Sequence, residues 1–142
     1  MGTNKLAFAT LAGALTAFIL GYALYGVLLV GFFEANAGSA TGVMKESPSL
    51  IPIALGQVAG ALLLALVIQR WGGSQSMAGG AKVGALFGLL IALNYDLTMF
   101  GASNISNLTS TLVDPLVSVV ITAVTGAVIG LVLGKGGAAA TA

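Results

Sequence analysis

Asp96 is the residue of this sequence whose type and position could do chemistry. It stands in GALFGLLIALNYDLTMFG (residues 84–101), an otherwise uncharged run in a chain with only 6% charged residues. A carboxylate near the middle of a bilayer costs roughly 2.5–3.5 kcal/mol, so such a group should face protein and be hydrogen-bonded or protonated. Asn94, Tyr22 or Tyr25 could donate a hydrogen bond to it. We therefore ask which elements position Asp96.

Other polar residues gather in the same half of the apolar segments as Asp96. These residues predict a polar pocket or shallow vestibule at the end of the segments where Asp96 lies, which we call the outer half. The opposite, inner half consists almost entirely of Gly, Ala, Leu and Val. Glu34, Asn104, Asn107 and Asp114 stand close to the outer boundary. The candidate ligand or ion site consists of Asp96, Asn94, Tyr95, Tyr22, Tyr25 and Gln57.

The depth of Asp96 in the membrane decides between three interpretations. Between Lys82 and Asp96 lie 13 residues, about 20 Å of helix, whereas the hydrocarbon core is about 30 Å thick. Lys82 can extend its long stem to the interface, but Asp has almost no reach. If the third helix begins near Met77, Asp96 marks the outer interface. Otherwise it makes a buried structural hydrogen bond or serves transport or ligand binding.

Composition excludes several classes of function. The chain has no His and no Cys, and its net charge is +1. The usual zinc and haem ligands, thiolate nucleophiles and the commonest general base are missing, and no basic surface favours nucleic acid. We therefore predict no enzyme activity, no catalytic or metal-ligating residues, no cofactor and no nucleic-acid partner.

Four apolar segments are long enough to cross a bilayer, which takes about 20 residues. The mean hydropathy is +1.07 and 58% of residues are hydrophobic. A run such as ALLLALVI at 61–68 does not alternate as a barrel strand would. We predict an all-α fold, a compact bundle of four transmembrane helices forming a single domain over 1–142. The expected helices span about 6–33, 49–70, 80–101 and 114–134.

Proline marks two expected helix starts. Asp114 followed by Pro115 is typical of an N-cap and a first helical residue, and predicts the start of the fourth helix. Ser47–Pro48 predicts the start of the second helix, with Pro52 in or near its first turn.

Basic residues indicate the topology. Lys5, Arg70, Lys82 and Lys135 fall on one side of a four-span arrangement, and only Lys45 falls on the other. By the positive-inside rule, both termini and the middle loop are cytoplasmic. The prediction is an integral protein of the bacterial inner membrane.

Small residues recur at four-residue spacing in every expected helix, which places them on one face and lets neighbouring backbones approach. These stripes either close the bundle or leave a face for a second copy or another membrane protein. The two halves also share short matches, such as GAL at 13–15 and 84–86, so two parallel two-helix repeats are a further hypothesis. The predicted packing residues are Gly13, Gly21, Gly56, Gly60, Gly84, Gly88, Gly126 and Gly130.

The stretch LGYALYGVLLVGFFEANAG at 20–38 resembles the opening of a family of small bacterial four-helix integral membrane proteins of unknown function. The match is carried by Gly21, Tyr22, Tyr25, Gly26, Phe32 and Phe33. GGAKVGALFGLLIAL at 79–93 is similar to the glycine-rich third helix of that family. The sequence departs from the family by lacking the Trp that is usually paired with the first aromatic. The resemblance implies a fold and a location, but no activity.

Two functional hypotheses follow. The first is a non-enzymatic structural or interaction subunit that self-associates or docks to a larger membrane assembly. The alternative is a small transporter or channel for a cation, a proton or a small solute, which uses the outward-facing polar cluster around Asp96. Against the alternative stands the inner half, which offers no polar path to the cytoplasm.

Overall fold

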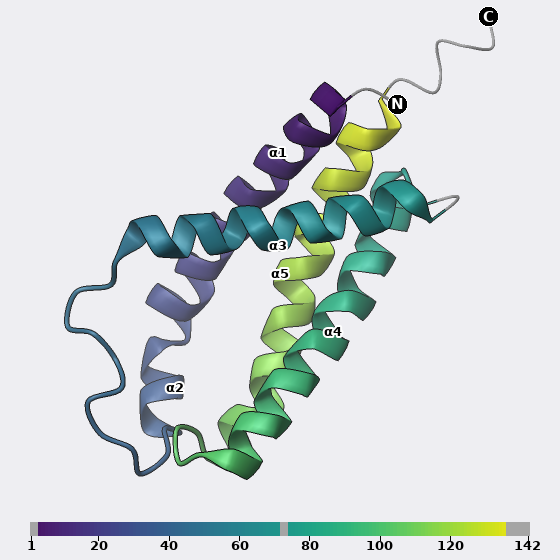
Figure 1. The fold of residues 1–142 in the computed structure, drawn as a ribbon. Helices are drawn as coiled ribbons and strands as arrows, with labels where there is room; N and C mark the ends of the chain where they lie inside the picture. The colour runs from purple at the N-terminus through teal and green to yellow at the C-terminus, as the bar shows by residue number, and fades with distance from the viewer. Residues whose placement is uncertain (1–2, 72–73, 136–142) are drawn as a thin grey trace, which may run out of the picture.

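The computed structural model describes residues 3–71 and 74–135 and has an all-α fold, as predicted (Figure 1). A π-helical segment, η1, follows the first helix, and a short helix follows η1. The elements are α1 (Thr3–Gly21), η1 (Tyr22–Leu28), α2 (Val30–Ala35), α3 (Leu50–Arg70), α4 (Met77–Ala102) and α5 (Leu108–Gly134).

Within the residues that the structure describes, four helical segments are long and apolar enough to cross a membrane. α1 with η1 provides 26 residues, α3 provides 21, α4 provides 26 and α5 provides 27. Each exceeds the approximately 20 residues that span the hydrocarbon core. The chain is therefore an integral membrane protein built from these four helices.

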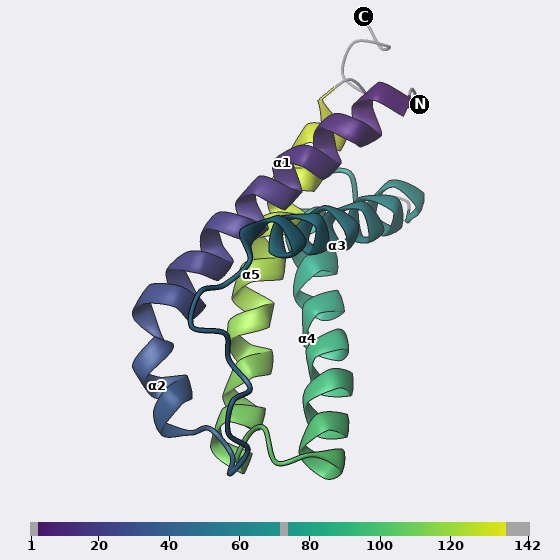
Figure 2. The same ribbon diagram turned by 60° about the vertical axis from the view of Figure 1, so that its left-hand side comes forward.

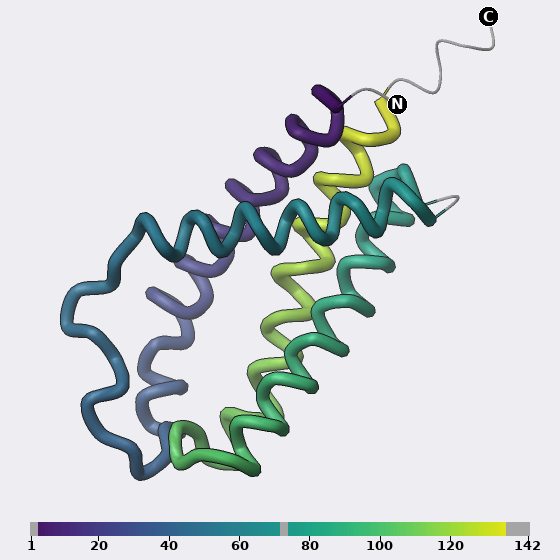
Figure 3. Tube along the Cα trace, viewed as in Figure 1, coloured from purple at the N-terminus to yellow at the C-terminus, as the bar shows by residue number. Residues whose placement is uncertain are grey.

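The long helices do not all run side by side. α1, α4 and α5 extend between two ends of the molecule, whereas α3 crosses them in both views (Figures 1 and 2). The start of α1 and the end of α5 lie at one end, and the connections after α2 and α4 lie at the other, which we call the loop end. The connection between α2 and α3 runs from the loop end back along the molecule to the start of α3 (Figure 3). The largest buried cluster, which includes Ala9, Leu64, Ile68 and Ile129, joins α1, α3 and α5.

The predicted start of the fourth helix at Asp114–Pro115 is wrong. α5 begins at Leu108, and Asn107 is its N-cap, whose side-chain oxygen accepts a hydrogen bond from the Ser110 N–H at 3.0 Å. Asn is as good an N-cap as Asp, and because Asn107 precedes Asp114 in the chain, the helix begins earlier than predicted. Pro115 then lies buried inside the helix, as membrane helices tolerate. Asp114 is consequently carried on a helix face.

The other predicted boundaries shift by a few residues. Ser49 rather than Ser47 occupies the cap position of α3, and Pro52 lies in its first turn as expected. α4 begins at Met77, where the Ser76 side chain accepts from the Gly79 N–H at 3.0 Å. The first span was expected to be one helix over 6–33. Instead it changes to π-helical geometry at Tyr22 and breaks at Leu29.

Glycines bring the backbones of α4 and α5 into direct contact. A Cβ added to Gly80 would collide with the carbonyl oxygen of Gly126, and one added to Gly84 would collide with that of Thr122. The same holds in reverse, since a Cβ on Gly126 would meet the carbonyl oxygen of Gly80. Only glycine permits this approach, so the α4–α5 pair is the tightly closed part of the bundle.

The remaining predicted packing glycines divide into two groups. Gly13, Gly88 and Gly130 lie against neighbouring helices or their side chains. A Cβ on Gly21, Gly56 or Gly60 would have no neighbour within 4 Å, so the prediction that these three form helix contacts is wrong for this chain alone. The crossing of α3 leaves Gly56 and Gly60 beside open space, and Gly21 lies at the end of α1, where η1 begins. The two halves differ in how their helices pack, because α4 and α5 lie in close contact whereas α3 crosses α1. The hypothesis of two parallel two-helix repeats stays a prediction.

A hydrogen-bonded clasp, formed by residues 36–40 and 104–107, joins the two connections at the loop end. The N–H groups of Gly38 and Ala40 donate to the carbonyl oxygens of Ile105 (2.9 Å) and Asn104 (3.0 Å). The Asn107 side chain donates to that of Asn36 at 3.1 Å. The N–H group of Asn107 donates in return to the carbonyl oxygen of Asn36 at 3.2 Å, so each connection supplies hydrogen-bond acceptors to the other.

Gly38→Val is expected to open this clasp, because a Cβ at residue 38 would collide with the carbonyl oxygen of Asn104. We expect a loss of roughly 1–3 kcal/mol in the free energy of unfolding, measured by denaturant titration in detergent. Gly42→Ala is an unsuitable control because Gly42 has a positive φ of 67°, so Ser39→Ala serves instead. Unchanged stability of Gly38→Val would contradict the structural importance of the clasp.

Candidate functional site

Asp96 on α4 and Asp114 on α5 form a carboxyl pair inside the bundle. The two residues line the same two cavities, and their carboxyl groups are electrostatic neighbours. One carboxyl oxygen of Asp96, Oδ2, is buried without a hydrogen-bond partner. Burying such an oxygen without a partner is costly, so the pair is suited to hold a proton or a cation.

Asp96 lies near the far end of its span and nevertheless faces the bundle. α4 begins at Met77, and the 20 residues from there to Asp96 cover about 30 Å of helix, roughly the thickness of the hydrocarbon core. A helix that begins near Met77 is the condition under which Asp96 would only mark the outer membrane interface. However, the buried Oδ2 atom and the two cavities distinguish Asp96 from a carboxylate that merely meets water.

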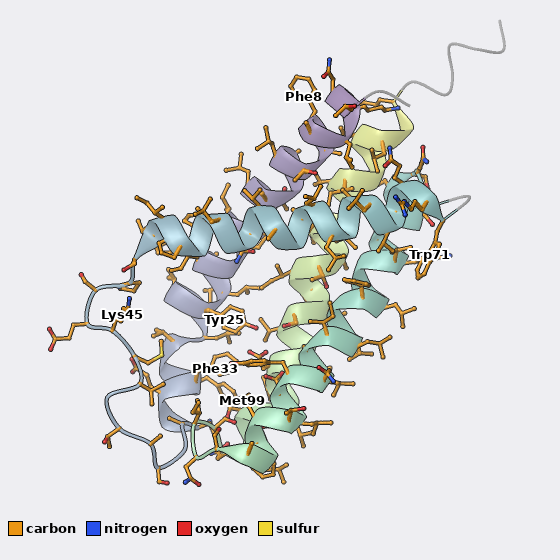
Figure 4. All side chains as sticks on the ribbon, in the orientation of Figure 1. Phe8, Tyr25, Phe33, Lys45, Trp71 and Met99 are labelled. Atoms are coloured by element: carbon orange, nitrogen blue, oxygen red, sulfur yellow. The ribbon has the colours of Figure 1, made fainter. Side chains whose placement is uncertain are left out.

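Tyr25 of η1 completes the polar side of the pair. Its hydroxyl group lies 3.5 Å from Oγ of Ser118, one helical turn beyond Asp114, and it also neighbours the Asp114 carboxyl group. The Tyr25 ring of η1 and the Phe33 ring of α2 pack with centroids 5.3 Å apart, and both project toward α5 (Figure 4). This packing holds the Tyr25 hydroxyl near the carboxyl pair.

The first cavity, the loop-side cavity, has a volume of about 510 Å³ and lies between the carboxyl pair and the loop end. Its charged lining residues are Glu34, Lys45, Asp96 and Asp114. Three of the four acidic residues of the chain therefore line one cavity with a single lysine. Such a cavity raises the local concentration of cations.

The second cavity, the bundle cavity, has a volume of about 330 Å³ and is lined by residues of α1, α3, α4 and α5. Its wall is mostly carbon, with residues such as Leu64, Phe87 and Ile121. Because Asp96 and Asp114 line both cavities, the carboxyl pair stands where the two cavities meet.

The predicted candidate site comes together only in part. Tyr25 and Gln57 line cavities that Asp96 also lines. Asn94 is exposed, and Tyr22 is 65% exposed, so neither is placed as the hydrogen-bond donor that was expected for Asp96. Tyr95 is 62% exposed and lies at the edge of the bundle cavity. The reason is helical geometry, since Asn94 and Asp96 lie two positions apart and point in different directions.

Sequence reasoning missed the contribution of α5. The sequence pattern predicts a helix cap at Asp114, and it predicts no site role for Ser118 or Thr122. All three line the bundle cavity together with Thr125. The signal was available, because residues 114, 118, 122 and 125 follow the spacing of one helix face. With this polar face, the inner half is less uniformly apolar than expected.

Comparisons of the chain with protein-family models, curated proteins and solved structures gave no match. The resemblance to a bacterial membrane family of unknown function thus stays a prediction, and the functional argument depends on the geometry of the carboxyl pair and its two cavities.

Proposed function

We propose that this protein is a small, non-enzymatic membrane transporter or channel that binds a cation or proton at the Asp96–Asp114 pair. The single observation that carries the proposal is the position of the pair, which lines both cavities. A cation in the loop-side cavity would meet the carboxyl groups before anything in the bundle cavity. A buried carboxyl oxygen without a partner gains a favourable interaction when a cation or proton arrives.

The proposed location is the bacterial inner membrane with both termini in the cytoplasm. The basic residues near the termini and around the connection between α3 and α4 support it through the positive-inside rule. In this orientation the loop-side cavity opens to the outside, and cations would enter there. The polar face of α5 extends the route inward as far as Thr125.

Flux measurements in proteoliposomes test this proposal. We expect wild-type protein to increase proton, sodium or rubidium flux above that of empty liposomes, and Asp114→Asn to return it to background. Glu46→Gln is the matched control, because Glu46 is an exposed acidic residue of the connection between α2 and α3. Equal flux through wild-type and Asp114→Asn protein would disprove the proposal.

A structural or interaction subunit is the second candidate, and the first half of α3 favours it. Residues 50–56 are all exposed, and a Cβ on Gly56 or Gly60 would meet no neighbour. Small residues on an open membrane helix permit close approach by another helix. This candidate predicts a mass above that of one chain when the protein is extracted from native membranes. A lone monomer would argue against it.

A further inference from the structure

The bundle cavity is larger and more apolar than a bare ion requires. Its volume of about 330 Å³ lies in the range of small-molecule sites, and would hold roughly ten waters at about 30 Å³ each. Waters against Leu64, Phe87 and Ile121 find no hydrogen bonds there, so an apolar group that displaces them is favoured. The wall is therefore matched to the carbon skeleton of an organic molecule.

A buried hydroxyl group marks the inner part of this cavity. Thr125 is 3% exposed and lines the cavity, and its Oγ1 has no hydrogen-bond partner. It lies eleven residues beyond Asp114, about 16 Å along α5. Thr122 on the same helix donates to the Ser118 carbonyl oxygen at 2.6 Å, whereas Thr125 keeps its donor free. A ligand with an acceptor at its far end would satisfy that donor.

The bundle cavity is also bordered by exposed residues. Gly60 of α3 and Ile91 and Tyr95 of α4 line it and are themselves exposed. These residues belong to membrane-spanning helices, so this border faces the lipid. Amphipathic cations concentrate at membrane surfaces through apolar burial and charge, and such molecules could reach the cavity from the bilayer.

We propose that the bundle cavity binds an elongated organic monocation. Its ammonium group lies at Asp96 and Asp114, its apolar body contacts Leu64 and Phe87, and an acceptor at its far end meets the Thr125 hydroxyl. This inference rests on the proposed function for the role of the carboxyl pair, and it adds the chemical class of the ligand.

Three synthetic probes test the three parts of the ligand on purified full-length protein in nanodiscs. The probes are para-methoxybenzoylcholine, benzoylcholine without the methoxy acceptor, and the carbon isostere of the first, in which a neutral tert-butyl group replaces trimethylammonium. We expect saturable binding of the first probe by calorimetry, and at least about tenfold weaker binding of the neutral isostere. Equal binding of the cation and the isostere, or no saturable binding, would overturn the inference.

Gly60→Leu tests the cavity itself. Because a Cβ on Gly60 meets no neighbour within 4 Å and Gly60 lines the cavity, leucine can enter the space without displacing the fold. We expect at least about tenfold weaker probe binding. Gly56→Leu, one turn earlier and equally unobstructed, should bind the probe as wild type does. Wild-type affinity in Gly60→Leu would overturn the inference.

Thr125→Val tests the acceptor. This substitution should weaken the binding of para-methoxybenzoylcholine by about threefold or more and leave the binding of benzoylcholine unchanged. The same loss for both probes would overturn the assigned role of Thr125.

The flux measurement separates this inference from the proposed function. Ion flux that depends on Asp114, without probe binding, refutes the organic ligand alone. Probe binding without flux refutes transport and leaves the ligand site in place.

Discussion

Gly84→Leu is expected to separate α4 from α5 and to cause the largest loss of stability of any single substitution considered. Even a Cβ at residue 84 would collide with the carbonyl oxygen of Thr122, and a backbone atom cannot rotate away as a side chain can. We expect the free energy of unfolding to fall by about 3 kcal/mol or more. Gly84→Ala should lose less, about 1–3 kcal/mol.

The measurement is unfolding of purified protein in mixed micelles, followed by circular dichroism. Gly56→Leu is the matched control, because it introduces the same side chain at a helical glycine that has open space around it. The control should unfold like wild type. If Gly84→Leu retained wild-type stability, the close backbone contact between α4 and α5 would have to be abandoned as the basis of the fold.

Asp96→Asn and Asp114→Asn are each expected to reduce the same activity strongly, and the double variant should lose no more than either single variant. Residues that act as one unit have non-additive effects, and these two line both cavities and interact with each other. Each single variant should lower transport at least about a hundredfold, equivalent to roughly 2.7 kcal/mol. Initial flux rates in proteoliposomes measure the effect.

Additive losses in the double variant would indicate two independent carboxyl groups rather than a pair. Folding is checked by comparing the circular dichroism and elution volume of each variant with wild type. Asn is close to Asp in size and can hydrogen-bond, so the cavities should keep their shape.

The helices could be predicted because a membrane span leaves an unmistakable apolar signal. The predicted bounds are correct to within a few residues, except for the start of α5 and the first span, which breaks at Leu29 instead of continuing to residue 33. That start was misjudged for a physical reason. Asn107 and Asp114 are both good caps, and the choice between them depends on the clasp, in which Asn107 contacts Asn36. A contact over such a separation in sequence has no local signal.

Only part of the candidate site could be predicted from the sequence, for a related reason. Asp96 was recognisable because it is a charge in an apolar run, and Tyr25 because it shares the outer half. Asp114 appeared to be explained already by the proline that follows it. The crossing of α3, which leaves Gly56 and Gly60 without contacts, could not be foreseen either. A stripe of small residues indicates that another helix can approach closely, but it does not specify which helix that is.

The clasp at the loop end has a consequence for how the protein is made. Asn36 and Asn107 are 71 residues apart, and two further spans must be synthesised and inserted between them. Until the connection between α4 and α5 has been synthesised, the N–H groups of Gly38 and Ala40 lack the carbonyl acceptors of Ile105 and Asn104. Closing the clasp is thus a late step in biogenesis, and it joins the first span to the last.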